Sequence, residues 1–319
     1  MKGMNKMTQL HFKDNLLTKV AWYYYKDGLT QNEIAGILNI SRNKVVRLLE
    51  KARVEGIVQF NIKGSGLHCL GIERDFIRTF QLTDAFIIPT PKGNVSDSLG
   101  KAAAQYLENH LPSNALLGIG WGETVSKTLH DLNLDCPANL SIVTLTGGVN
   151  YYFQRQGGQM SQSIAKFKGQ IHIIPSPFLG STDEMSQSIL SEPAVKDILH
   201  LAALANATIV GIGGLSSEAT IIKEEKMTLG EMAFIRNNNG VGDILGQFYD
   251  CSGKILNLPH HKRLIGVSLD VLRKMKHVIG VAAGQQKVDA IYGAMKGKYI
   301  RTLITDEETA ISLLQKEGK

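Results

Sequence analysis

The pattern of hydrophobic and polar residues divides the chain into two unlike parts. In the first 60 or so residues, apolar positions recur every three or four residues in three short stretches, which predicts three helices. From residue 84 onward, short apolar runs alternate with helical patterns of about 10 to 15 residues. We therefore expect a small helical unit followed by a larger α/β unit.

The predicted helices of the first unit have recognisable ends. They span residues 14–26, 31–38 and 42 to about 53, and the alternating stretch GIVQFNI (56–62) predicts a small strand, or wing. Thr30 and Glu33 form a capping box before the second helix, and Ser41 caps the third. Two short helices joined by about three residues are typical of a helix-turn-helix.

The outer face of the third helix is polar. Its apolar residues follow the helical repeat and should pack inward, which leaves Ser41, Arg42, Asn43, Lys44, Arg47 and Lys51 on the outside. Arg pairs with guanine and Asn with adenine through two hydrogen bonds, whereas Lys and hydroxyl groups suit phosphate. The alternative is a helical hairpin with a solvated basic face. Caps, spacing and charge together favour binding in the major groove of DNA.

Charge is distributed unevenly along the chain. Residues 1–62 contain ten Lys/Arg and five Asp/Glu, a net charge of 10 − 5 = +5, whereas the other 257 residues contain 25 and 24, a net charge of +1. This pattern fits a polyanion-binding end attached to a neutral body. We expect a DNA-binding domain at 1–62, a linker at 63–66 (KGSG) and a ligand-binding domain at 67–319.

Several classes of protein are disfavoured. Cys69, Cys136 and Cys251 are widely spaced and form no CxxC pair, so neither a zinc site nor a disulfide framework is predicted. The N-terminus lacks an apolar signal core, and no run approaches about 20 apolar residues. We expect a cytoplasmic protein without metal or cofactor. Nucleophile-elbow, zinc-protease, Walker and complete dinucleotide motifs are absent from the sequence. A sugar-phosphate isomerase with a similar sheet stays an alternative, but the DNA-binding module makes catalysis unnecessary, so no enzyme is predicted.

The body has the rhythm of a parallel sheet covered by helices on both faces. Strand patterns fit 84–89, 114–119, 140–145, 171–175, 207–212, 277–282 and 300–305. Glycine-rich turns follow three of them, in GIGWGETVSKTL (118–129), TLTGGVN (144–150) and VGIGGLSS (210–217). Each could be only a tight turn. Three in one sheet predict a phosphate site at its carboxyl edge, with candidate residues Gly120, Thr124, Thr146, Gly147, Gly148 and Gly213.

Two charged residues stand in apolar surroundings. Asp243, between Gly242 and Ile244, is a candidate ligand for sugar hydroxyls, although it could also be a cap or turn residue. Lys287 lies on the first turn after a predicted strand, where a cation opposes the helix dipole unless an anion is near. That conflict predicts a phosphate partner for Lys287.

The motifs together resemble a known family. VAWYYYKDGLTQNEIAGILNISRNKVVRLLEKARVEGIV, NGVGDILGQFYD and GVAAGQQKVDAIYGAMKGKYIRTLITDEETA are similar to segments of the SorC/DeoR-type sugar-binding transcriptional regulators, and the likeness covers about residues 13 to 317. It implies a winged helix-turn-helix followed by a Rossmann-like domain related to sugar-phosphate isomerases and deaminases. It also implies an oligomer, expected to be a tetramer, that represses an uptake operon until a phosphorylated effector binds.

The resemblance also assigns residues and ligands. Asp243 and Lys287 fall on the family's effector-contacting motifs, and Trp121 stands where a related repressor has an aromatic residue. The implied effector is phospho-autoinducer-2, a quorum-sensing signal. The alternatives are a repressor of another sugar-phosphate pathway and, from another class, a sugar-phosphate isomerase or deaminase carrying a regulatory DNA-binding module.

Overall fold

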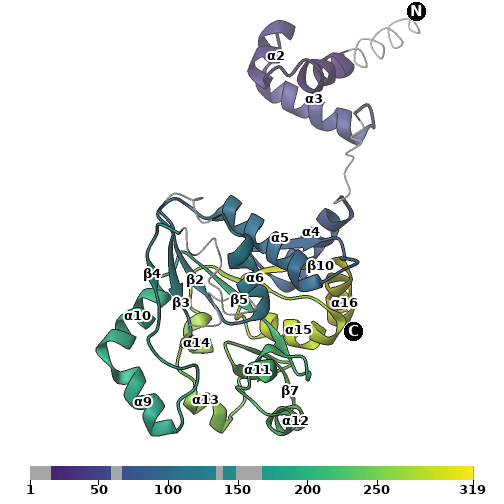
Figure 1. Ribbon diagram of the computed structural model, residues 1–319. Coiled ribbons are helices and arrows are strands. Elements are labelled where there is room, and N and C mark those ends of the chain that lie inside the picture. Colours follow the sequence, from purple (N-terminus) through teal and green to yellow (C-terminus); the bar gives the residue numbers. More distant parts are fainter. Residues whose placement is uncertain (1–15, 59–66, 134–138, 149–166, 319) are drawn as a thin grey trace, which may run out of the picture. The chain divides into compact units, whose positions relative to one another are not determined.

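The chain folds into two separate units, which divide between Gly64 and Ser65. The computed structural model (Figure 1) describes residues 16–58, 67–133, 139–148 and 167–318. The predicted linker, 63–66, lies outside these residues. Each unit is taken by itself below.

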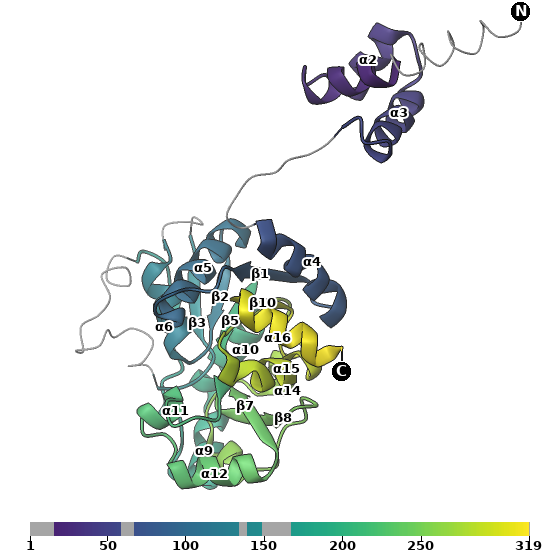
Figure 2. The ribbon, with the colours of Figure 1, turned by 90° about the vertical axis from the view of Figure 1, so that its right-hand side faces the viewer.

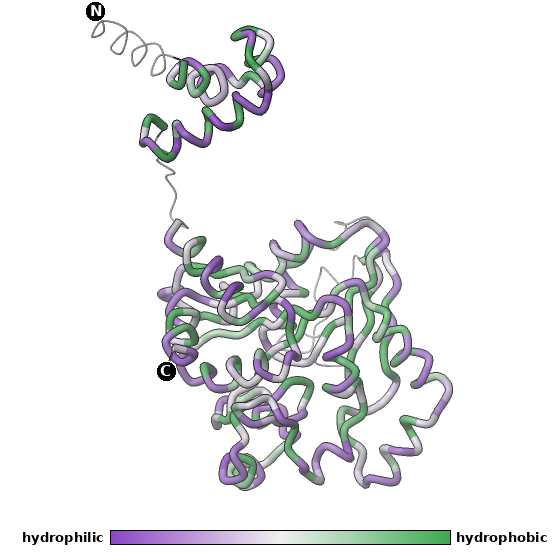
Figure 3. The backbone as a smooth tube through the Cα atoms, turned by 180° about the vertical axis from the view of Figure 1, so that it is seen from behind, coloured by the Kyte–Doolittle hydropathy of each residue, from purple (hydrophilic) through white to green (hydrophobic). Residues whose placement is uncertain are grey.

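The first unit contains three helices around a small core. A helix over residues 16–25 precedes α2 (Gln31–Leu38) and α3 (Arg42–Val54). The core contains Val20, Ile34, Val45 and Leu49. Hydrophobic and hydrophilic colours alternate along this unit in Figure 3, and the buried residues of α2 and α3 are Ile34, Val45, Leu49 and Ala52.

Both predicted helix caps of the first unit are confirmed. Thr30 Oγ1 accepts a hydrogen bond from the Glu33 amide, and Glu33 accepts one from the Thr30 amide at 2.7 Å. Ser41 Oγ accepts from the Lys44 amide at 3.3 Å. Residues 56–58 form a turn and a bend without a strand, and the rest of the predicted wing, 59–62, lies outside the described residues.

The second unit is built on a seven-stranded parallel sheet. Its strands are β1 (Asp84–Ile88), β2 (Leu116–Ile119), β3 (Ser141–Thr144), β4 (Ile171–His172), β5 (Ala207–Gly211), β9 (Val278–Val281) and β10 (Thr302–Asp306). Their order in the sheet is β1-β10-β9-β5-β2-β3-β4. All seven predicted strands are therefore present, and every pairing is parallel, because helical crossovers connect most of them.

Helices cover both faces of this sheet. The helices of the second unit are α4 (Leu67–Phe80), α5 (Val95–His110), α6 (Glu123–Asp131), α9 (Asp183–Ser191), α10 (Pro193–Ala203), α11 (Thr220–Lys223), α12 (Leu229–Asn237), α13 (Pro259–Arg263), α14 (Leu269–Leu272), the 3₁₀ turn η1 (Gln285–Lys287), α15 (Val288–Lys296) and α16 (Glu307–Glu317). Figure 2 shows α5 and α6 on one side of the sheet and α4, α15 and α16 on the other.

Consecutive strand residues contribute to opposite cores. Ile209 packs in the core beneath α5 and α6, whereas Val210 packs with α4, α10, α15 and α16. Ile304 and Leu303 divide in the same way. Side chains alternate across a strand, so a sheet buried on both faces requires a continuous apolar run. This requirement explains why the seven strands were readable from the sequence.

A second, antiparallel sheet was not predicted. It comprises β6 (Gly213–Gly214), β7 (Gly240–Ile244) and β8 (Gln247–Asp250), and it directly follows β5 through Ile212. Leu245 and Gly246 connect β7 to β8, both with positive φ, as a type I′ hairpin turn requires. Gly213 pairs with Asp243, which sets this sheet at the carboxyl edge of β5.

No helix within the described ranges is long and apolar enough to cross a lipid bilayer.

Candidate effector site and DNA-binding face

A cavity of about 230 Å³ lies where the chain changes direction in the large sheet. After β2 the chain proceeds towards β4, and after β5 it proceeds towards β1, so β2 and β5 flank a switch point. The cavity is lined from the carboxyl ends of β2, β5 and β9, from β6 and β7, and from η1. Ligands of open parallel sheets bind at such a crevice.

Asp243 is the buried carboxylate of the cavity. Its side chain comes from β7, and the residue is 7% exposed. Oδ2 accepts a hydrogen bond from the Gly246 amide at 3.0 Å, within the turn that joins β7 to β8. Burial raises the pKa of Asp243 to about 6, against the opposing effects of the Gly246 hydrogen bond and of Lys287. The hydrogen bond from Gly246 thus holds the carboxyl group in place.

Lys287 is the cation of the cavity. It ends η1, immediately after Gly284 turns the chain away from β9. Burial lowers the pKa of Lys287, while the charges of Asp243 and Glu123 oppose that change. Among the described residues, its ammonium group has neither a hydrogen bond nor an ion pair. Its unsatisfied donors are consequently available to a ligand that enters the cavity.

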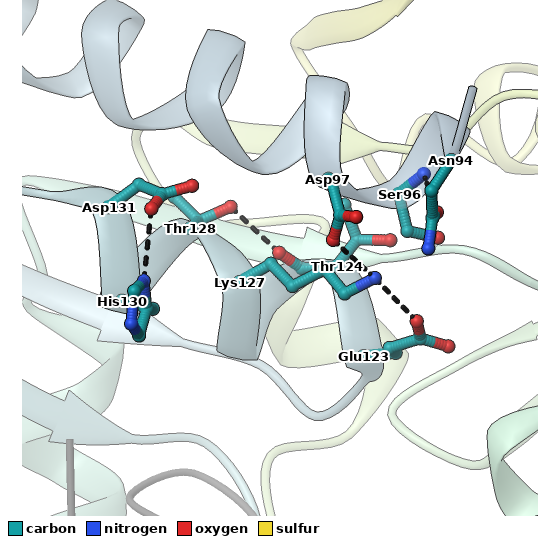
Figure 4. Close-up of polar contacts among 9 residues, drawn as sticks. All are labelled: Asn94, Ser96, Asp97, Glu123, Thr124, Lys127, Thr128, His130 and Asp131. Atoms are coloured by element: carbon teal, nitrogen blue, oxygen red, sulfur yellow. Dashed lines mark hydrogen bonds and ion pairs between the residues drawn. The ribbon is translucent and has the colours of Figure 1, made fainter. Parts of the chain in front are cut away.

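The start of α6 forms another wall of the cavity. Gly122 caps this helix with φ of 141°, a conformation that side-chain-bearing residues rarely adopt, so glycine is required there. Glu123 follows it. Figure 4 shows Lys127 between Asp97 of α5 and Glu123, with Nζ distances of 2.7 and 2.8 Å to their carboxylate oxygens. This arrangement gives Glu123 a cationic partner beside the cavity, shared with Asp97, and connects α6 to α5.

Five of the nine predicted effector residues line this cavity: Trp121, Thr124, Gly213, Asp243 and Lys287. Trp121 is buried and stacks on Phe178 with ring centroids 4.7 Å apart. Gly213 lies against the Asp243 carboxylate, which leaves no room for a Cβ. The structure brings these residues together from four separate segments.

The other four predicted residues are not among those that line the cavity. Gly120 donates its amide to Ile209 and packs against Val210. Thr146 is buried and bridges Gly266, so the turn after β3 lies against a neighbouring segment.

The amides of that turn have protein partners. Those of Gly147 and Gly148 donate to the carbonyls of Ile265 and Ser176. The N–H groups of this turn are therefore paired with the backbone, and our expectation that the turn surrounds a phosphate stays a prediction.

Other residues that line the cavity were not singled out from the sequence. They include Gly122, Glu123, Gly214, Thr220, Lys223 and Gln286. Gln286 could have been found, since it precedes Lys287 on the same turn. Lys223 belongs to α11, which has only four residues, and it forms an ion pair with Glu218 at 3.1 Å. Such a short helix leaves no periodic pattern in the sequence.

The six predicted DNA-binding residues share one end and one side of α3. Ser41, Arg42, Asn43, Lys44, Arg47 and Lys51 are all exposed, whereas Val45, Leu49 and Ala52 are buried. Lys51 pairs with Glu55 at 3.3 Å, further along the helix. Because the Ser41 oxygen accepts the capping hydrogen bond, its hydroxyl proton is still available to an acceptor such as phosphate.

The geometry suits a polar, anionic ligand. The cavity offers a buried acceptor at Asp243, an unpaired ammonium at Lys287 and hydroxyl side chains such as Thr220. A compound with several hydroxyl groups and one phosphate would match these groups. No cluster of three or more His, Cys, Asp or Glu side chains suited to a metal occurs in the described parts of the chain.

Comparison with known proteins identifies the family. The model of the sugar-binding domain family matches residues 66–315. Two solved structures have the same fold. The full-length sorbitol operon regulator SorC from Klebsiella pneumoniae gives a TM-score of 0.68 at 24% identity, covering 94% of this chain and 98% of that one. A DeoR family transcriptional regulator from Listeria monocytogenes gives 0.70 at 22% identity, covering 76% and 98%.

Two relatives match over nearly their whole length. The transcriptional regulator LsrR of Enterobacter sp. (strain 638) is 36% identical over 313 residues, which cover 96% of this chain and 94% of that protein. LsrR of Escherichia coli (strain K12) is 37% identical over 308 residues, 95% of each chain. These relatives are transcriptional regulators and not enzymes. The chain thus belongs to the sugar-binding transcriptional regulators of the SorC/DeoR type, as a relative of LsrR.

Proposed function

We propose that this regulator is a repressor of an uptake or processing operon, which a phosphorylated, carbohydrate-like signal releases from operator DNA. The observation that carries the proposal is the pairing, in one cavity, of the buried Asp243 carboxylate with the unpartnered Lys287 ammonium. Asp243 accepts hydrogen bonds from ligand hydroxyls, and Lys287 binds the phosphate. The start of α6 and strand β6 complete the site.

The first unit binds the operator through α3. Support comes from the six exposed polar residues at its N-terminal end and outer side, and from the net charge of +5 over residues 1–62. Two half-sites of operator DNA call for a symmetric protein, so the regulator acts as a homo-oligomer of at least a dimer, with a tetramer expected from the resemblance.

Phospho-autoinducer-2 is the signal that the resemblance implies, which would make this a quorum-sensing repressor. A sugar phosphate of another pathway is the second candidate, because the same two charged groups fit any small phosphorylated polyol. Turnover of the ligand is not part of either proposal, since the full-length relatives are regulators.

The test begins with thermal unfolding of the full chain in a panel of phosphorylated sugars that includes phospho-autoinducer-2. A ligand that binds only the folded protein raises its unfolding temperature. The ligand that does so is then added to a gel shift with operator DNA. We expect release from the wild type but not from Asp243→Ala or Lys287→Ala, both of which should still bind operator. Normal release from both variants would contradict the proposal.

A further inference from the structure

Two side chains at the starts of neighbouring helices contact each other in the first unit. Nε of Arg42, the first residue of α3, donates a hydrogen bond to Oε1 of Gln31, the first residue of α2, over 3.3 Å. Gln31 is half-buried, and Arg42 is exposed. Both line one groove with Thr30 and Asn32, so the arginine side chain is directed towards the start of α2.

This contact leaves a defined set of donors free. A guanidinium group donates through Nε and through two terminal nitrogens. Gln31 takes the Nε proton, and the terminal nitrogens of Arg42 have no partner among the described residues. Two neighbouring donors are what the O6 and N7 acceptors of guanine accept in the major groove. The contact therefore leaves the two terminal nitrogens of Arg42 as the atoms that can donate to a base.

The other cations of α3 are not held in this way. Lys44 and Arg47 have no side-chain partner within the described residues, and Lys51 pairs with Glu55 further along the helix. A phosphate contact tolerates a mobile cation, whereas two hydrogen bonds to one base require a fixed direction. An arginine that is already oriented loses less conformational freedom when it binds. Arg42 is thus the cation best prepared for base recognition.

We propose that Gln31 is a positioning residue that holds Arg42 for recognition of one guanine in the operator. Gln31 acts through the Arg42 guanidinium and determines sequence preference from a helix that does not enter the groove. The inference rests on the proposed binding of α3 to the major groove and adds a second helix to the specificity of that interaction.

The test uses the full chain and a duplex that the wild type selects from a random DNA pool. Affinity is measured by fluorescence anisotropy for this duplex and for duplexes in which each G·C pair in turn is replaced by A·T. For the wild type, we expect one replacement to weaken binding on the order of 10- to 100-fold through Arg42. Arg42→Ala should abolish the preference at that position alone.

Three further variants separate positioning from general damage. Gln31→Ala should lose most of the preference at the Arg42 position and keep the others. Gln31→Glu retains an acceptor for Nε, so it should keep the preference while its added negative charge lowers affinity for every duplex. Asn32→Ala, which changes an exposed neighbour in the same groove, should behave as wild type. Thermal unfolding should be equal for the Gln31→Ala and Asn32→Ala variants.

Two results would overturn the inference. A Gln31→Ala protein with the full wild-type preference at the Arg42 position would show that Arg42 needs no support. An Arg42→Ala protein with an unchanged preference at every position would show that there is no base contact to position. A wild type that selects no sequence at all would instead reject the proposed function, and with it this inference.

Discussion

Gly213 of β6 pairs with Asp243 of β7, and a Cβ at position 213 would overlap Oδ1 of the Asp243 carboxylate. The backbone of one strand thereby fixes the acceptor of the cavity. Gly213→Ala should displace this carboxylate, lower the free energy of unfolding by about 1–3 kcal/mol through overpacking and abolish release by the effector. Operator binding should persist, since the substitution lies in the other unit.

Gly230→Ala is the matched control for this prediction. Gly230 lies in α12, where a Cβ would make only an ordinary contact with Thr228. Alanine in a helix is more stable than glycine by about 0.5–1 kcal/mol, so this variant should be slightly stabilised and respond to effector normally. A Gly213→Ala protein with unchanged stability and unchanged release by the effector would show that the backbone of Gly213 does not hold the Asp243 carboxylate in place.

The raised pKa of Asp243 predicts a pH dependence of stability. Between pH 3.8 and about 6, the folded protein holds a proton on Asp243 that the unfolded chain has lost. Stability contributed by this group therefore falls as pH rises through that window and stays low above it. The Asp243→Asn variant does not lose stability in this way, because its side chain does not ionise. Its free energy of unfolding should gain on the wild type between pH 4.5 and 7, by about 2 kcal/mol, because about 1.5 pH units of the window up to pH 6 contribute 1.36 kcal/mol each.

The histidines do not obscure this comparison. Burial lowers the pKa of His260 and of His261 to about 4, so their contribution is lost as pH falls from 6.5 towards 4, the opposite sign. Both proteins contain them, and the difference between the two unfolding curves cancels their effect. A difference that is constant with pH would mean that Asp243 ionises normally in the folded state.

Lys127 connects α5 and α6 beside the cavity. Burial lowers its pKa, but its hydrogen bonds to Asp97 and Glu123 outweigh that effect and raise it. Lys127→Met should lower the free energy of unfolding by about 1 kcal/mol and weaken binding of the phosphorylated ligand, because Glu123 is left unpaired. Lys101→Met, an exposed change on α5, should do neither. Equal unfolding midpoints in urea for the two variants would contradict this role.

Arg47 is exposed on α3 and contributes nothing to the core of the first unit. Its replacement by Ala should weaken operator binding on the order of 1–3 kcal/mol without changing the unfolding temperature. Binding should also weaken steeply with salt, since phosphate contacts release counterions. Lys19→Ala, which removes an exposed cation from the first helix, serves as the control in the same anisotropy titration. Similar affinity for both variants would exclude Arg47 from the interface.

The sequence predicted the elements whose stability depends on neighbouring residues in the chain or on burial of both faces of a strand. Five of the seven parallel strands, β2, β3, β5, β9 and β10, are buried on both faces, so their apolar runs are visible without knowledge of their neighbours. The capping box at Thr30 and Glu33 involves four consecutive residues and was equally visible. The β6–β8 sheet was missed because β6 and β7 are glycine-rich, β8 has only four residues, and the stability of all three strands comes from pairing.

The cavity was only partly predictable for a related reason. Asp243 and Lys287 were identified because they are charged residues in apolar surroundings of the sequence. Both line the cavity. Lys223 was not identified, because a four-residue helix has no periodic signal. The turn at Gly147–Gly148 has the same composition as the turns that do line the cavity. Only the segments that pair with it, at Ile265 and at Ser176, show that its amides are occupied.

The central claim is that operator DNA and the phosphorylated effector oppose each other across the two units of the chain. An effector can release the protein only if it binds the DNA-free arrangement more tightly, and the coupling must then be reciprocal. The direct measurement is calorimetric titration of the full chain with the ligand that the thermal screen identifies, with and without saturating operator duplex. We expect the duplex to weaken ligand binding by roughly 5- to 150-fold, the same factor by which the ligand weakens operator binding. Identical ligand affinity in both titrations would contradict the account.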